Sequence, residues 1–158
     1  MPEARTDWSA TIHLPKSDFP MKGDLAKREP DLLRVWDESG MYEKLQERQK
    51  GRPSFVLHDG PPYANGNIHI GHALNKTLKD MTVKARALLG NAAPYVPGWD
   101  CHGLPIETAL LKEMKMSKRG VTDIPKSRRA AVAFAERFIG IQREGFIRLG
   151  GLGDWFRP

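Results

Sequence analysis

The chain has 158 residues, which is enough for one domain with a hydrophobic core but too few for two large domains. Its composition, 40% hydrophobic and 28% charged, is ordinary, and no apolar run approaches the roughly 20 residues that a membrane-spanning helix requires. The net charge of +6 is uneven: residues 109–158 contain 11 basic and 5 acidic side chains, whereas residues 1–108 contain 14 of each. Such an excess permits contact with nucleic acid, but it is also typical of a solvated surface.

The N-terminal sequence and the cysteine content indicate the compartment. The sequence MPEARTDWSATIHLPK contains early acidic residues and no apolar stretch, so neither a secretory signal nor a transit peptide is predicted. Cys101 is the only cysteine, which excludes an internal disulfide and suits a reducing environment. We therefore expect a cytoplasmic protein.

The first fifty residues predict an arm followed by short helices. Residues 1–23 are polar, contain two prolines and lack helical periodicity, which favours an irregular arm. A short helix is predicted over residues 24–28 and another from Pro30, because proline suits the first helical position. Gly40 is expected to end that helix, and residues 41–49 continue a helical pattern.

A strand and a turn-rich loop are predicted next. Ser54–His58 is a short apolar run rich in residues that favour strands, which is typical of a strand buried in a parallel sheet. Residues 59–68, DGPPYANGNI, are rich in glycine, proline and asparagine. These residues fix the shape of the backbone and bring amide groups close to a ligand.

A long amphipathic helix is predicted from His69, with Gly90 ending it and a second strand over residues 94–96. Five apolar side chains, three or four residues apart, are expected to form its core face: Leu74, Leu78, Met81, Ala85 and Leu88. Its basic side chains are expected to be solvated: Lys76, Lys79, Lys84 and Arg86. Strand, helix and strand in this order predict a right-handed βαβ unit and the α/β fold class.

The start of this helix is a candidate phosphate-binding site. A helix N-terminus after a parallel strand has free amide groups and a positive dipole end. His69 and His72 are three residues apart, so both lie on one face there and can donate hydrogen bonds to phosphate, while Gly71 allows close approach to the backbone. A zinc-binding pair is the less favoured alternative, because the glutamate of H-E-x-x-H is missing. His13 is interpreted as an ordinary histidine.

Two sequence blocks resemble a known family. HDGPPYANGNIHIGHALNKTLKDM (58–81) and PYVPGWDCHGLPIE (94–107) are similar to the catalytic domain of class I aminoacyl-tRNA synthetases, specifically the isoleucyl enzymes. The HIGH signature alone is shared with related nucleotidyltransferases, whereas the surrounding blocks are more specific. LPKSDFPMKGDLAKREP near the N-terminus and FIRLGGLGDWFRP at the end extend the resemblance to nearly the whole chain.

The resemblance implies a domain organisation. Residues 1–50 would be an N-terminal arm and helices packing on the catalytic domain. Residues 51–158 would be the first half of a Rossmann-like catalytic domain, with parallel strands and crossover helices, ending before the expected editing insertion. The editing domain, the second half of the fold, the anticodon-binding helices and the zinc cysteines of the family have no counterpart in this sequence. We therefore expect residues 1–158 alone to be poorly active and marginally stable.

The resemblance also implies the site residues. His69 and His72 match histidines that contact the ATP phosphates and stabilise the transition state, and Asn65 and Gly71 belong to the same ATP-binding site.

The amino acid is expected to lie nearby. Asp100 matches the carboxylate that pairs with the α-ammonium group of isoleucine, and Pro61 matches a loop position beside that group. An ammonium group requires a fixed carboxylate, which agrees with this role. The alternative for Asp100 is a helix or turn cap before His102, and Cys101 and His102 are interpreted as packing or loop-shaping residues.

The implied reaction is ATP-dependent activation of isoleucine to isoleucyl adenylate, followed by transfer to tRNA(Ile), with ATP and Mg²⁺ as the substrate complex. No resident metal site is expected here, since zinc belongs to other parts of the family, and the full-length enzyme is expected to be a monomer. Two alternatives remain: another class I synthetase of the valyl or leucyl subgroup, and a non-catalytic basic RNA-binding fragment.

A second family signature has a misleading counterpart. KMSKR at residues 115–119 resembles KMSKS, whose lysine assists the phosphates in the family. That signature belongs far downstream, after the second half of the nucleotide-binding fold. We interpret KMSKR as a coincidence in a solvated basic stretch.

Two further helices are predicted in the last third of the chain. One opens after Pro105 with Ile106, Leu110 and Met114 on one face. After a break over residues 120–125, Ser127 is expected to cap the other. Its expected core face consists of Ala130, Phe134, Phe138 and Ile141.

Overall fold

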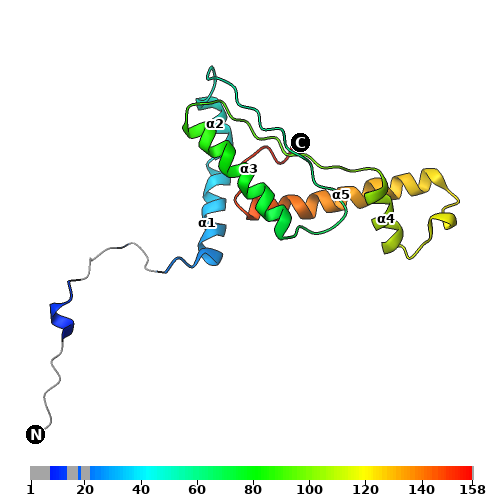
Figure 1. The fold of residues 1–158 in the computed structure, drawn as a ribbon, viewed down its shortest axis with the longest axis horizontal. Coiled ribbons are helices and arrows are strands. Elements are labelled where there is room, and N and C mark those ends of the chain that lie inside the picture. Colours follow the sequence, from blue (N-terminus) through cyan, green and yellow to red (C-terminus); the bar gives the residue numbers. More distant parts are fainter. Residues whose placement is uncertain (1–7, 14–17, 19–21, 158) are drawn as a thin grey trace, which may run out of the picture.

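In a computed structural model, the chain is described at residues 8–13, 18 and 22–157. Much of the predicted irregular arm lies outside these ranges. Within it, Trp8–Thr11 forms the short 3-10 helix η1, where no regular element was expected. The rest of the fold consists of five α-helices joined by extended segments within the described ranges (Figure 1).

The N-terminal helices are α1, Leu25–Glu38, and α2, Met41–Arg48. The prediction of two short helices before Gly40 was wrong, because α1 continues through Pro30. Proline lacks the N–H that would bond to the carbonyl four residues earlier, that of Ala26. The Arg148 guanidinium donates to this carbonyl instead (3.4 Å), and it also pairs with Glu29 (2.8 Å). Gly40, at φ 60°, turns the chain between α1 and α2, as expected.

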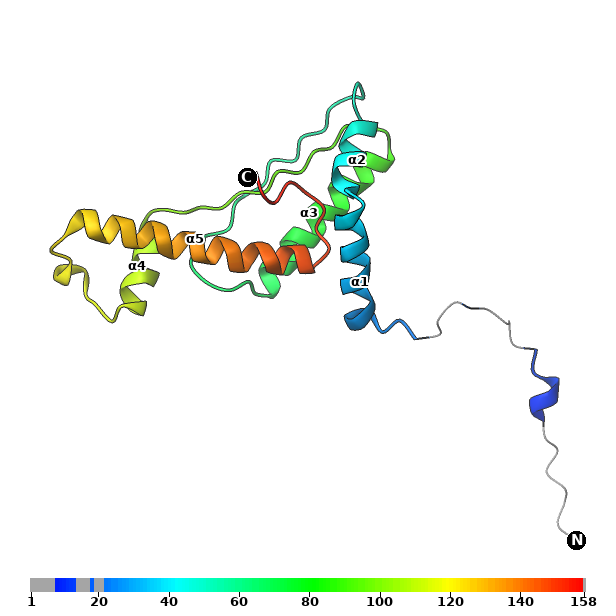
Figure 2. The ribbon, with the colours of Figure 1, turned by 180° about the vertical axis from the view of Figure 1, so that it is seen from behind.

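The predicted parallel strands are not formed, so the sheet of the expected α/β, Rossmann-like fold is absent from the described residues. Instead, residues 53–64 and 92–100 are two extended segments that run side by side (Figures 1 and 2). They form only isolated parallel bridges, one between Ser54 and Ala92 and one between Tyr63 and Asp100.

The backbone bonds of the extended segments explain why no ladder forms between the bridges. Between the two bridges, each segment contains two prolines, which have no N–H to donate: Pro61, Pro62, Pro94 and Pro97. The amide of Ala93 donates to the Gln49 side chain (3.1 Å), and that of Tyr95 donates to the Tyr42 hydroxyl (3.3 Å). The carbonyl of Tyr95 accepts from the amide of Asp154 (2.9 Å). The central groups are therefore satisfied by other parts of the chain.

Helix α3, Ile70–Leu88, begins and ends close to the predicted positions, and Gly90 follows it at φ 95°. Its orientation differs from the prediction. The expected core face points outward, since Leu74, Leu78 and Met81 are each more than half exposed. The buried side chains of α3 are Val83 and Lys76, one of the lysines expected in solvent.

The C-terminal helices are α4, Leu104–Glu113, and α5, Ile124–Arg148, which pack against each other, with the 3-10 helix η2, Lys118–Gly120, between them. Asp123 caps α5 by accepting from the amide of Lys126 (2.9 Å), so the prediction of Ser127 was wrong. Two predicted core positions are instead substantially exposed, Met114 on the turn after α4 and Ile141 on α5.

The described residues form two small hydrophobic clusters. One joins the loop over residues 59–68 to α4 and α5 and contains Ala64, Ile106, Leu110, Phe134 and Ala135. The other lies beneath α3 and contains Val83, Ala93, Tyr95, Phe146 and Trp155. Trp99 packs against both clusters, so the second extended segment connects them. No helix in the described ranges is long and apolar enough to span a membrane.

Candidate active site

The first turn of α3 is closed by two histidine side chains. His69 is the N-cap residue, with an extended backbone, and its Nδ1 accepts a hydrogen bond from the Gly71 amide (3.1 Å). The Nδ1 of His72 accepts in return from the amide of His69 (3.3 Å). This is the reciprocal arrangement of a capping box, with imidazoles in the places usually taken by serine and glutamate. The two rings lie with their centroids 3.9 Å apart.

The capping bonds determine which nitrogen of each histidine is available. An imidazole nitrogen that accepts a hydrogen bond carries no proton, so the neutral ring carries its proton on the other nitrogen. Both Nδ1 atoms accept from backbone amides, which leaves each Nε2 as an N–H donor. Within the described ranges neither Nε2 has a hydrogen-bond partner. The helix therefore presents two N–H donors beside its own positive end.

The surroundings of His72 favour the neutral imidazole. Its ring meets the Phe146 ring edge-on at 6.4 Å. Burial lowers the pKa of His72 below its usual value, and the neighbouring His69 and Lys76 lower that pKa further. A neutral His72 keeps Nδ1 free to accept the capping bond.

Gly71 is required by the histidine pair itself. A Cβ at this position would lie 2.9 Å from Cε1 of the His69 ring and 3.1 Å from its Nδ1. Such contacts are too close, so a larger residue would displace the ring that caps the helix. This glycine thus accommodates the His69 ring, a role that was not predicted from the sequence.

The loop over residues 59–68 is joined directly to Asp100. The amide of Asp100 donates to the carbonyl of Pro62 (2.8 Å), and the amide of Ala64 donates to the carbonyl of Asp100 (2.9 Å). The carboxylate of Asp100 accepts from the amide of His102 through Oδ1 (3.3 Å) and is 28% exposed. The local turn cap considered as the alternative is thus present, and in the described chain Oδ2 is not engaged in a hydrogen bond.

The remaining predicted residues lie on the same loop. Asn65 is half-buried, and its side-chain Nδ2 donates to the carbonyl of Pro105 at the start of α4 (3.4 Å). Pro61 is exposed. The parallel pairing thus brings Pro61 and Asn65 close to Asp100 in the fold, and the histidine pair follows directly at the end of the loop.

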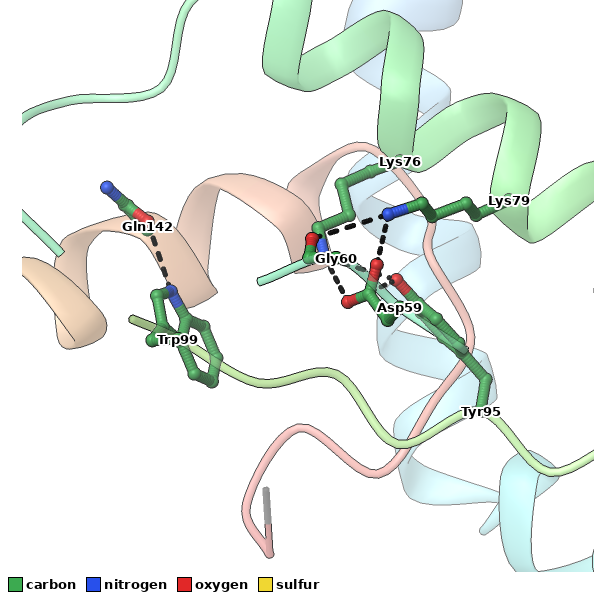
Figure 3. A network of polar contacts seen from close by, with 7 residues as sticks. All are labelled: Asp59, Gly60, Lys76, Lys79, Tyr95, Trp99 and Gln142. Atoms are coloured by element: carbon green, nitrogen blue, oxygen red, sulfur yellow. Dashed lines mark hydrogen bonds and ion pairs between the residues drawn. The ribbon is translucent and has the colours of Figure 1, made fainter. Parts of the chain in front are cut away.

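A buried charge cluster, not foreseen from the sequence, ties the beginning of the loop to α3 (Figure 3). The carboxylate of Asp59, only 4% exposed, accepts from Lys76 (2.5 Å), from Lys79 and from the Tyr95 hydroxyl (3.4 Å). Lys79 also donates to the carbonyl of Gly60 (3.4 Å). Burial lowers the pKa of Lys76 and raises the pKa of Tyr95. The cluster carries two positive charges for one negative charge, which leaves a net positive charge under the first turns of α3.

A second unforeseen residue is Gln142 of α5, which is almost completely buried. Figure 3 shows its side chain directed at Trp99, whose indole N–H donates to Oε1 (3.0 Å). The spacing of the sequence could have predicted its burial. Phe134, Phe138 and Gln142 are four residues apart and so lie on one face of the helix, whereas the predicted core face continued from Phe138 to Ile141.

Comparisons with known proteins identify the family of the chain. Residues 31–158 match the model of the family described as tRNA synthetases class I (I, L, M and V). The chain is 57% identical to the isoleucine–tRNA ligase of Stenotrophomonas maltophilia over 96% of its length, and 51% identical to that of Aquifex aeolicus over 100%. The match to the isoleucine–tRNA ligase of Persephonella marina is 51% identical over 96%. In each case the chain spans 16% of the relative's length. The chain belongs to the class I tRNA synthetase family of the I, L, M and V group.

Proposed function

We propose that this chain forms the ATP- and amino-acid-binding end of an isoleucine–tRNA ligase, within a longer polypeptide called here the intact enzyme. The enzyme would activate isoleucine with ATP and transfer it to tRNA(Ile). Relatives with 51–57% identity over nearly all of the chain carry the name isoleucine–tRNA ligase, which supports this choice among the four members of the family. We further propose that the intact enzyme is a cytoplasmic monomer.

The observation that carries the proposal is the double histidine cap of α3. Its two Nε2–H donors lie beside the positive end of the helix dipole. A phosphate group placed there would accept hydrogen bonds from both imidazoles. The net positive charge of the Asp59 cluster, whose Lys76 lies one turn after His72, favours the same anion.

The reaction needs no nucleophile from the enzyme. The carboxylate of isoleucine attacks the α-phosphorus of ATP, a bond forms between carboxylate oxygen and phosphorus, and the bond to the bridging oxygen breaks, so that pyrophosphate leaves. The ribose hydroxyl of tRNA then attacks the adenylate carbonyl, and AMP leaves. The role of the two histidines is to stabilise the developing charge on the phosphate oxygens, which fixed donors do efficiently.

Asp100 would hold the α-ammonium group of isoleucine. Its Oδ2 is free of hydrogen bonds among the described residues, and its backbone is fixed to the loop on both sides. Pro61 is an exposed residue of the same loop, and its backbone would lie beside the same group. We assign Mg²⁺ to the substrate, as the usual counterion of ATP, and Asn65 to the nucleotide.

The test is amino-acid-dependent exchange of pyrophosphate into ATP by the intact enzyme. We expect exchange with isoleucine, weaker exchange with valine, since a pocket discriminates weakly against one missing methylene, and none with leucine or methionine. Exchange only with valine or leucine would assign the chain to that subgroup instead. Binding of RNA without any exchange would support the non-catalytic alternative.

A further inference from the structure

Gln142 makes three hydrogen bonds that connect three parts of the chain. Its Nε2 donates to the carbonyl of Tyr63 (2.9 Å) and to the carbonyl of Gly66 (2.8 Å). Its Oε1 accepts from the indole of Trp99 (3.0 Å). The side chain is 1% exposed, so both donors and the acceptor are used in a site without access to water.

These bonds reach both of the segments that meet at the bridge between Tyr63 and Asp100. On one segment, Gln142 bonds to Trp99, which immediately precedes Asp100. On the other, it bonds to the carbonyls of Tyr63 and Gly66, which precede and follow Ala64 and Asn65 in the sequence. Two backbone bonds of the bridge hold Asp100 to the loop, and no continuous ladder extends from them along the two segments. Gln142 supplies the further connections, and α5, a helix of 25 residues, holds Gln142 itself.

We propose that Gln142 is a positioning residue that fixes the carboxylate of Asp100 relative to the loop over residues 59–68, and thereby sets the affinity of the enzyme for isoleucine. This inference rests on the proposed function. Gln142 does not need to touch the substrate. It acts through Trp99 and through the two loop carbonyls.

The chain provides a matched comparison at the other bridge. Gln49 is also buried, and its Oε1 accepts from the amide of Ala93 (3.1 Å), beside the bridge between Ser54 and Ala92. Both glutamines therefore connect a helix to an extended segment through a buried bond. Only Gln142 lies at the bridge that contains Asp100.

The experiment compares Gln142→Met with Gln49→Met in the intact enzyme, by isoleucine-dependent pyrophosphate exchange with the active-site concentration titrated. Both substitutions leave buried polar groups without partners, so both are expected to lower the melting temperature. We expect Gln142→Met to raise the KM for isoleucine about tenfold or more, because a misplaced Asp100 carboxylate loses part of its charge-assisted hydrogen bond to the ammonium group, and such a bond contributes about this factor to binding. The KM for ATP should change by less than about threefold, because α3 holds the histidines by its own cap. Gln49→Met should leave both KM values unchanged.

Three outcomes would overturn the inference. The first is an unchanged KM for isoleucine in Gln142→Met, and the second is an equal rise in both KM values, which indicates general loosening. The third is the same change in Gln49→Met. If Gln142→Met does not fold, Trp99→Phe removes the indole bond together with part of the ring that packs against both clusters. A rise in the KM for isoleucine that exceeds any rise in the KM for ATP is then expected, and an unchanged KM for isoleucine, or an equal rise in both, contradicts the inference. Absence of isoleucine-dependent exchange in the unsubstituted enzyme would instead refute the proposed function, and the inference about Gln142 would fail with it.

Discussion

At the scale of single residues, the spacing of His69 and His72 was sufficient to place both rings on one helix face, because residues three apart are neighbours on any α-helix. The spacing could not determine which nitrogen each ring presents. That depends on the extended backbone of His69, which turns its side chain back onto the first turn. The pair is therefore both the cap of the helix and the source of its free donors.

The lowered pKa of His72 predicts a pH dependence of stability. The unfolded chain takes up this proton near pH 6.5, whereas the folded chain takes it up only at lower pH because Phe146, His69 and Lys76 surround the ring. As the pH falls below about 6.5, the unfolded state binds more protons, so the free energy of unfolding decreases. Urea denaturation of the chain between pH 7.5 and pH 5 should show this decrease, and His72→Asn should reduce it. An NMR titration that gives the His72 ring a pKa at or above about 6.5 would contradict this prediction.

At the scale of elements, the sequence predicted the extent of α3 but not its orientation. A regular apolar stripe from Leu74 to Leu88 suggested the buried face, yet these side chains are exposed and Lys76 is buried. The reason is a tertiary interaction: Asp59, seventeen residues earlier, provides a carboxylate that Lys76 and Lys79 reach together. Periodicity measures only the apolar residues of one segment, and it contains no information about a charged partner elsewhere.

The Asp59 cluster should be essential for stability. Asp59→Asn removes the only negative charge and leaves two lysines facing each other in a buried site, so we expect a loss of about 3–5 kcal/mol in the free energy of unfolding. Adding Lys76→Met to Asp59→Asn should recover part of this loss. The control is Lys50→Ala, which breaks the exposed pair with Glu47 and should change stability by less than about 1 kcal/mol. Equal effects of Asp59→Asn and Lys50→Ala in chemical denaturation would show that the cluster does not stabilise the fold.

At the scale of the whole molecule, most helices were predictable and the arrangement between them was not. Local signals such as Gly40, Gly90 and the spacing of Ile106 and Leu110 placed three helices well. The predicted sheet failed because the extended segments lack N–H donors at four prolines between the bridges, and because residues 93–95 bond instead to Gln49, Tyr42 and Asp154. These partners lie between about forty and sixty residues away along the chain. Pairings at such separations are not encoded in any local pattern.

In the candidate site, too, local sequence blocks were predictable, whereas a connection between them was not. The residues on the loop and at the start of α3 were predicted because they form continuous sequence blocks, and Asp100 was predicted from its own block. Gln142 was missed because it joins those blocks from a helix more than forty residues further on. Its function as a connector depends on bonds from α5 to both blocks, of which Figure 3 shows the bond to Trp99.

The double histidine cap of α3 is proposed to bind the phosphates of ATP during activation of isoleucine. The decisive measurement is the rate of isoleucine-dependent pyrophosphate exchange in His72→Asn of the intact enzyme. Asparagine can place an oxygen where Nδ1 accepts the capping bond, but it has no counterpart of Nε2. His13→Asn, which changes an exposed histidine far from α3 in sequence, is the control. The account predicts a fall in kcat of about 10²–10³ for His72→Asn, with folding retained and with His13→Asn unchanged. Equal exchange rates in the two variants would contradict it.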